Sequence, residues 1–153
     1  MGSQPSVEDP NELDFSTLFV ECVPNHQILW PTLSNSYKRP ESAYWINDSP
    51  IFDVGIHTLK LAFEVMMSKE LKTRVVRRND LKNQITWEQK TIMREYIDWI
   101  TVEFVGNDKT STFYAISRSS ASRFDFGTNS RRLYRLVECV KQELQNPLPL
   151  SIV

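Results

Sequence analysis

The chain has 153 residues and a mass of 17.9 kDa, a size that predicts one domain with short terminal extensions. Its residues are 41% hydrophobic and 24% charged, which provides a sizeable core and excludes the intrinsically disordered class. A formal charge of -1 and a pI near 6.1 argue against a protein that coats nucleic acid. No apolar run is long enough to cross a membrane, so we expect no transmembrane segment.

The charge is unevenly distributed along the chain. Residues 1–64 hold nine acidic and three basic side chains, for a charge of -6. Residues 65–153 hold fifteen basic and ten acidic side chains, for a charge of +5. The acidic leading segment is therefore either solvated, or lies across the basic face of this chain or of a partner.

The cysteines and histidines give little indication of a redox or metal site. Cys22 and Cys139 form no CxxC pattern, which favours a reduced intracellular protein with incidental thiols. His26 and His57 leave too few ligands for a typical zinc site, so we expect no metal and no cofactor. The acidic N-terminus resembles neither a secretory signal nor an uncleaved mitochondrial transit peptide. We predict an intracellular protein, soluble or peripherally attached, with cytoplasm and mitochondrion both left open.

The first part of the chain combines proline with large apolar side chains. Six of the eight prolines lie within residues 1–50, which argues against long helices and central strands there. A solvated linker would not carry so many aromatic groups. We predict an extended arm over residues 1–48 that packs on the domain or on a neighbouring subunit. The candidate partner-binding residues of this arm are Phe15, Leu18, Phe19, Trp30, Tyr44 and Trp45.

Regular periodicities follow, over residues 49–146. Apolar residues three and four apart predict a helix at about 52–69, and a second such stripe predicts a helix from about Asn129 to just before Pro147. Between them, residues 73–77 and 85–91 read as one hairpin, and residues 99–105 and 112–117 as another. Residues 147–153 form a short C-terminal tail. The predicted fold class is α+β: a two-layer sandwich in which two helices cover one face of a four-stranded antiparallel sheet, preceded by the extended arm.

One polar loop stands out before the last helix. Residues 117–132 contain four arginines and five serines. Free amide groups at a helix N-terminus beside arginines can bind phosphate, a carboxylate or a lipid headgroup. The candidate anion-binding residues are Arg118, Ser122, Arg123, Asn129, Arg131 and Arg132. In the structural alternative, Asp125 pairs with Arg118 or Arg132, and the serines bond only to the turn backbone.

The same loop resembles a known family. Asp125, Gly127, Asn129 and Arg132 match an Asp-x-Gly-x-Asn-x-x-Arg motif, and the segment 117–133 resembles the C-terminal signature of the domain-of-unknown-function family numbered 1499. The segment 96–104 resembles the start of a strand in that family, with Asp98 at an acidic position. The glycine that the family has before the aspartate is absent here. The resemblance implies no reaction, because members of this family are largely uncharacterised.

Three functions compete at this stage. The first is a non-catalytic protein-interaction domain that serves as an accessory subunit of a larger assembly, soluble or membrane-associated, with protein subunits as partners. The second is a binding module for an anionic small ligand or lipid headgroup at the arginine-rich loop. The third is an enzyme that uses carboxylates such as Asp98, Glu103 and Asp125, although no catalytic pattern is present, so we assign no catalytic residue. A basic hairpin with Trp87 suggests nucleic acid, but the net acidity and the lack of a motif disfavour it.

Overall fold

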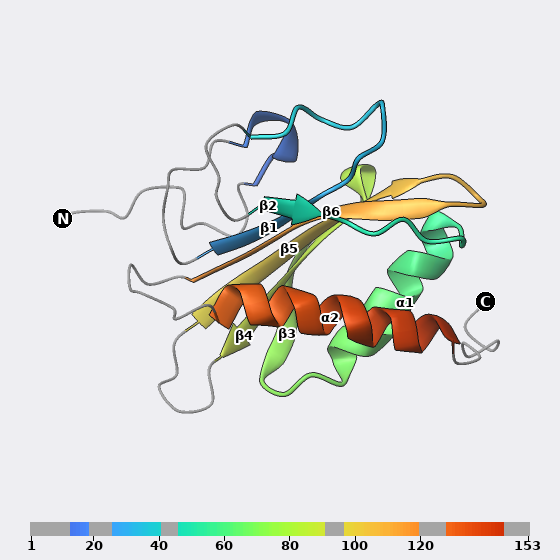
Figure 1. Cartoon of the computed structure of the whole chain (residues 1–153). Coiled ribbons are helices and arrows are strands. Elements are labelled where there is room, and N and C mark those ends of the chain that lie inside the picture. The colour runs from blue at the N-terminus through green and yellow to red at the C-terminus, as the bar shows by residue number, and fades with distance from the viewer. Residues whose placement is uncertain (1–12, 19–25, 41–45, 91–96, 120–127, 146–153) are drawn as a thin grey trace.

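The computed structural model describes residues 13–18, 26–40, 46–90, 97–119 and 128–145 (Figure 1). In chain order the elements are a 3-10 helix η2 (Phe15–Thr17), β1 (His26–Trp30), β2 (Ile46–Asp48), α1 (Ile56–Ser68), β3 (Thr73–Asn79), a 3-10 helix η3 (Asp80–Lys82), β4 (Gln84–Lys90), β5 (Ile97–Gly106), β6 (Ser111–Ser119) and α2 (Thr128–Gln145). Both predicted helices and both predicted hairpins are confirmed.

The expected four-stranded antiparallel sheet is wrong. The sheet has six strands in the order β2-β1-β6-β5-β4-β3 and is mixed, because β2 runs parallel to β1 while every other neighbouring pair is antiparallel. The two additional strands come from the segment that was expected to be an extended arm. Ile28 of β1 pairs with Ile116 of β6 on one side and with Ile46 of β2 on the other.

The prolines lie at the ends of these two strands and not inside them. Pro31 directly follows the last residue of β1, and Pro50 comes two residues after β2. Proline therefore ends each strand without removing a ladder hydrogen bond from its interior. Residues Gln27 to Trp30 are buried on both faces of the sheet, so β1 lacks the alternation of polar and apolar residues that identifies a half-exposed strand.

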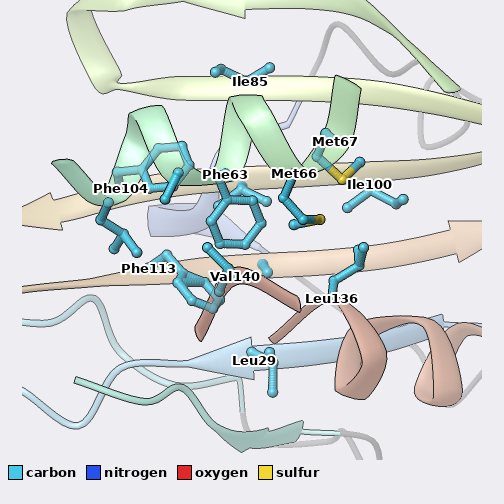
Figure 2. Close-up of a cluster of buried hydrophobic side chains, with 14 of the residues drawn as sticks. Leu29, Phe63, Met66, Met67, Ile85, Ile100, Phe104, Phe113, Leu136 and Val140 are labelled. Carbon is cyan, nitrogen blue, oxygen red and sulfur yellow. The ribbon is translucent and has the colours of Figure 1, made fainter. Parts of the chain in front are cut away.

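Both helices pack against one face of the sheet, where the main core lies (Figures 1 and 2). Phe63, Met66 and Met67 of α1 meet side chains from the central strands, among them Phe104 and Phe113. The Phe63 ring lies edge-on to the rings of Phe104 and Phe113, with centroid distances of 5.3 and 5.1 Å. Burial of such large groups is the main force that holds the helices to the sheet.

The opposite face carries a second, smaller core. Phe15 of η2 stacks on Tyr114 of β6 with a centroid distance of 5.5 Å, and Trp30 of β1 meets the same ring edge-on at 4.8 Å. Tyr37, in the loop after β1, stacks on Tyr114 as well. Residues outside the sheet thus form a partial third layer on this face, where two layers were expected.

Candidate functional site

One edge of the sheet, β3, is open in the described part of the chain, since β4 pairs with one side of it and no described strand pairs with the other. The amide of Lys90 donates to the carbonyl of Lys72 at 3.1 Å, so these residues form a hydrogen-bonded pair. Antiparallel ladders alternate such pairs with non-hydrogen-bonded ones. Thr73 and Val75 follow Lys72 by one and three positions in the same register. Both residues therefore belong to non-hydrogen-bonded pairs. Their amide and carbonyl groups therefore point toward the open edge.

The chain around this edge is strongly basic. Residues 72–90 hold six basic and two acidic side chains, for a net charge of +4. The basic residues are Lys72, Arg74, Arg77, Arg78, Lys82 and Lys90. Three of them form ion pairs: Arg74 with Glu88 and Arg78 with Glu64, each at 2.5 Å, and Lys82 with Asp14 at 3.7 Å. Lys72, Arg77 and Lys90 form no ion pair with any other residue that the structure describes.

A shallow pocket of about 470 Å³ lies at the start of β3. It is lined by Lys72, Thr73, Arg74, Glu88 and Lys90. The Arg74 side chain is 74% exposed and pairs with Glu88, whose side chain is only 9% exposed, so Arg74 keeps this buried carboxylate paired while Lys72 and Lys90 supply the other positive charges of the pocket. The described residues that line this pocket bring three cations and one carboxylate together, which suits it to an acidic side chain.

Exposed apolar side chains gather beside the same strand. Five large hydrophobic side chains are exposed among the described residues, and three of them are Leu71, Val75 and Leu81. Val75 lies on β3, Leu71 lies two residues before it begins, and Leu81 lies in η3 just after it ends. Single exposed hydrophobics are ordinary, but three around one open strand indicate a surface that can bury apolar area on association. We call β3 with its flanking residues 71–82 and Lys90 the basic edge.

Arg132, one of the predicted anion-binding arginines, bonds to side chains from β4, β5 and β6. The guanidinium of Arg132 donates from Nη2 to Asp98 Oδ2 at 2.7 Å, from Nε to Gln89 Oε1 at 2.7 Å and from Nη1 to Ser117 Oγ at 3.1 Å. The side chains of Arg132 and Asp98 are only 9% and 1% exposed. The structural alternative paired Asp125 with Arg118 or Arg132; Asp125 lies outside the described residues, and among these Asp98 forms an ion pair with Arg132. These contacts give Arg132 the role of joining α2 to the sheet.

Arg118 lies on the other side of the sheet. It is 8% exposed, its guanidinium carbon lies 5.6 Å from the centroid of the Trp99 ring, and its Nη1 lies 3.4 Å from Thr101 Oγ1. Successive strand residues face opposite ways, so Arg118 and its neighbour Ser117, which bonds to Arg132, lie on opposite faces. The structure therefore does not bring Arg118 and Arg132 together.

The remaining predicted anion-binding residues are only partly described. Asn129 and Arg131 lie in the first turn of α2, and Arg131 is exposed. Ser122 and Arg123 lie outside the described residues. The described geometry thus neither assembles nor excludes an anion site at this loop.

Of the six predicted partner-binding residues of the arm, three lie among the described residues and three do not. Phe15 and Trp30 are each 1% exposed, and Leu18 is half-buried against the same cluster. These three side chains pack on the sheet of their own chain, which is one of the two outcomes expected for the arm. Phe19, Tyr44 and Trp45 lie outside the described residues.

Two of the three carboxylates considered for acid–base chemistry, Asp98 and Glu103, do not meet, and the third, Asp125, lies outside the described residues. Asp98 and Glu103 are an odd number of residues apart on β5, so they face opposite sides of the sheet. Glu103 is 3% exposed and accepts hydrogen bonds from the hydroxyl of Tyr37 at 2.8 Å and from Gln84 Nε2 at 2.9 Å. Burial, and then the bond to Glu103, raise the pKa of Tyr37 to about 12. This network ties the loop after β1 to the sheet.

Sequence reasoning missed the basic edge as a site. The sequence indicates a basic hairpin, but the one role considered for it was a nucleic-acid surface with Trp87 as a possible stacking group, and the net acidity of the chain disfavours that role. Trp87 is 2% exposed and packs in the main core, as its spacing from Ile85 suggests. The signal that could have found the edge is a strand with three arginines in seven residues, because several charged side chains on one strand are typical of a sheet edge.

Comparisons with known proteins add little. No family model and no curated protein matches the chain. Among solved structures, the crystal structure of TTHA0849 from Thermus thermophilus covers 63% of this chain and 94% of its own, with 9% identity and a TM-score of 0.35. A likeness at this level assigns neither fold nor function to this chain.

Two further findings, on membrane-spanning helices and on metal-binding groups, apply to the described residues. Neither α1 nor α2 combines the length and hydropathy that a bilayer-spanning helix requires. No group of three or more His, Cys, Asp or Glu side chains in these segments is arranged to hold a metal ion.

Proposed function

We propose that this chain is a non-catalytic protein-interaction domain, an accessory subunit that binds an extended acidic segment of a partner protein along β3. The observation that carries the proposal is the basic edge itself: outward-facing backbone groups at Thr73 and Val75 lie beside a pocket lined by three cations. We further propose an intracellular setting for the assembly, and membership in family 1499 on the Asp-x-Gly-x-Asn-x-x-Arg motif.

Addition of a strand to an open sheet edge explains how such a surface binds. The backbone of the incoming segment pairs with Thr73 and Val75 and supplies affinity, while the pocket selects an acidic side chain at one position. Leu71 and Val75 offer apolar contact to the residues that alternate with it.

The charge of the edge also explains its selectivity. An open edge is a hazard because two copies can pair, and arginines and a bulge are common protections against this. β3 has both, since its register shifts between Val75 and Arg77. Two copies of a basic edge repel each other, whereas an acidic segment is attracted. The same residues therefore disfavour self-pairing and favour the proposed partner.

Titration with a model peptide tests the proposal. The probe is an acetylated and amidated peptide of alternating glutamate and valine, and its counterpart has lysine in place of glutamate. We expect the acidic peptide to bind, the basic peptide not to bind, and the affinity to fall as salt is raised. The double variant Lys72→Glu with Lys90→Glu should weaken binding roughly fivefold or more, because it reverses two charges in the pocket. The matched control is Lys109→Glu, an exposed lysine in the turn between β5 and β6.

A backbone variant separates strand addition from simple charge attraction. Val75→Pro removes an amide that, by the register of the ladder, points toward the open edge and away from β4, so the fold should tolerate it while peptide binding is lost. Equal binding of the acidic and basic peptides, or full binding by both Val75→Pro and the charge-reversed variant, would contradict the proposal.

A further inference from the structure

Two exposed lysines lie directly opposite each other at the start of the basic edge. Lys90 ends β4 and pairs with Lys72 through the hydrogen bond from its amide to the Lys72 carbonyl. The Cα atoms of such a pair are about 5.5 Å apart, so both ammonium groups can reach one ligand. Like charges directly opposite each other destabilise a sheet, and neither lysine has a counter-ion among the described residues. A bound anion would remove this cost.

The backbone at Lys72 is strained as well. Its φ is +54°, in the left-handed region that glycine and asparagine adopt far more readily than lysine. Among the described residues, the other non-glycine position with a positive φ holds Asn83, a residue type that suits it. Residues held in such conformations concentrate at active sites and ligand clamps. The position of Lys72 therefore indicates a use for its ammonium group.

The two other charged residues that line the pocket neutralise each other. Arg74 forms its ion pair with Glu88, whose side chain is only 9% exposed. Arg74 lies two positions after Lys72 and therefore on the same face of the sheet. Glu88 precedes Lys90 by two positions in the same way, and all four residues line the pocket. The two lysines thus offer two positive charges to a ligand.

This charge suits a phosphate better than a carboxylate. A glutamate side chain carries one negative charge and neutralises only one of the two lysines. A phosphate monoester carries about −1.5 to −2 at pH 7 and has three acceptor oxygens. It can therefore accept charge-assisted hydrogen bonds from both ammonium groups at once, and such bonds are roughly twice as strong as neutral ones.

We propose that the acidic side chain which the basic edge selects is a phosphorylated serine or threonine of the partner segment, bound by Lys72 and Lys90. This inference rests on the proposed function, because strand addition at Thr73 and Val75 brings the phosphate to the pocket. Phosphorylation of the segment then switches its affinity for this chain from low to high.

Peptide titration tests the inference, with the glutamate–valine peptide as the parent. A second peptide has phosphoserine in place of the central glutamate, and a third has one additional glutamate at its end, which matches the charge of the second at neutral pH. We expect the phosphoserine peptide to bind roughly fivefold or more tightly than the charge-matched one. Lowering the pH from about 7.5 to about 5.5 should remove most of this advantage, because the phosphate takes up its second proton with a pKa of about 6, whereas glutamate titrates at about 4.3.

Lys72→Asn separates recognition at the pocket from general charge attraction. It removes one ammonium group and places a better-suited residue in the left-handed region, so the melting temperature should stay unchanged or rise. The affinity for the phosphoserine peptide should fall roughly fivefold, toward that for the charge-matched peptide. Lys109→Asn is the matched control, an exposed lysine in the turn between β5 and β6, and should change neither quantity appreciably.

Inorganic phosphate, and vesicles of phosphatidylcholine with phosphatidic acid, test the other sources of a phosphate group. Both should displace the phosphoserine peptide only weakly, because neither supplies a strand to the open edge. Displacement by either one as effective as that by free phosphoserine peptide overturns the inference. Equal affinities for the phosphoserine and charge-matched peptides, or equal effects of Lys72→Asn and Lys109→Asn, overturn it too.

The Val75→Pro variant distinguishes failure of this inference from failure of the proposed function. If the parent peptide binds and Val75→Pro weakens it, while phosphoserine brings no advantage, strand addition stands and the phosphate inference is wrong. If Val75→Pro and the wild type bind the phosphoserine peptide equally tightly, and Lys72→Asn weakens that binding, phosphate recognition is supported and strand addition is contradicted.

Discussion

At the scale of single residues, the ion pair between Arg132 and Asp98 is the clearest example of a side chain whose role depends on a distant partner. Arg132→Ala should destabilise the protein by about 3–5 kcal/mol, because it removes the guanidinium that forms an ion pair with the buried carboxylate of Asp98. Chemical denaturation of the wild type and the variant measures this difference.

Two further variants test the origin of that loss. Lys141→Ala, which removes an exposed lysine from the same helix, should change stability by no more than about 0.5 kcal/mol. The double variant Asp98→Leu with Arg132→Met should recover much of the loss, because an apolar pair of similar volume can replace a buried ion pair. A small effect of Arg132→Ala would instead return this residue to the list of candidates for ligand binding.

Tyr37 gives a prediction about pH. Its pKa is raised from 10 to about 12, so the contribution of this group to stability is fully present below pH 10 and is lost as the pH rises toward 12. The unfolding free energy of the wild type should therefore fall more steeply between pH 10 and 12 than that of Tyr37→Phe. Parallel pH profiles for the two proteins would show that Tyr37 has no such shift.

The sequence could suggest an arginine-rich site but not which side chains contact one another in it. Arg132 and Ser117 were both in the predicted loop, yet Asp98 and Gln89, which complete the network, come from β5 and β4. Which carboxylate meets which arginine depends on strand register and on where α2 crosses the sheet. Neither follows from local residue types.

At the scale of elements, periodic segments were predictable and doubly buried ones were not. The two helices and the two hairpins each show a local repeat of apolar residues, which locates them to within a few residues. β1 shows none, because both of its faces are covered and its partner β6 lies some ninety residues later in the chain. β2 has only three residues and depends on β1 for its pairing.

The segment before β1 is predicted to be an integral part of the fold. Phe15 is 1% exposed and contacts both Trp30 and Tyr114, so Phe15→Ala should cost about 3–5 kcal/mol. Thr17→Ala, at an exposed position of the same 3-10 helix, should be close to neutral. Thermal or chemical unfolding of the two variants compares them. Equal and small effects would mean that this segment is detached from the sheet in solution.

At the scale of the whole molecule, the structure shows where the opposed charges of residues 1–64 and 65–153 lie. Much of the positive charge of the later part falls on the basic edge, where residues 72–90 carry +4. Two ion pairs between described residues already link the two parts, since Asp14 pairs with Lys82 and Glu64 pairs with Arg78. The composition predicted a basic face and an acidic counterpart, but only the strand order shows that the basic face is an open edge of the described sheet.

The central claim, that an acidic segment adds to β3 as a further strand, is tested most directly by amide hydrogen exchange at single-residue resolution. With saturating glutamate–valine peptide, exchange at Thr73 and Val75 should slow markedly, because their outward amides gain partners. Exchange in β2, the strand at the other edge of the described sheet, should not change. Unchanged exchange at Thr73 and Val75 under saturating peptide, or protection of β2 instead, would contradict the account.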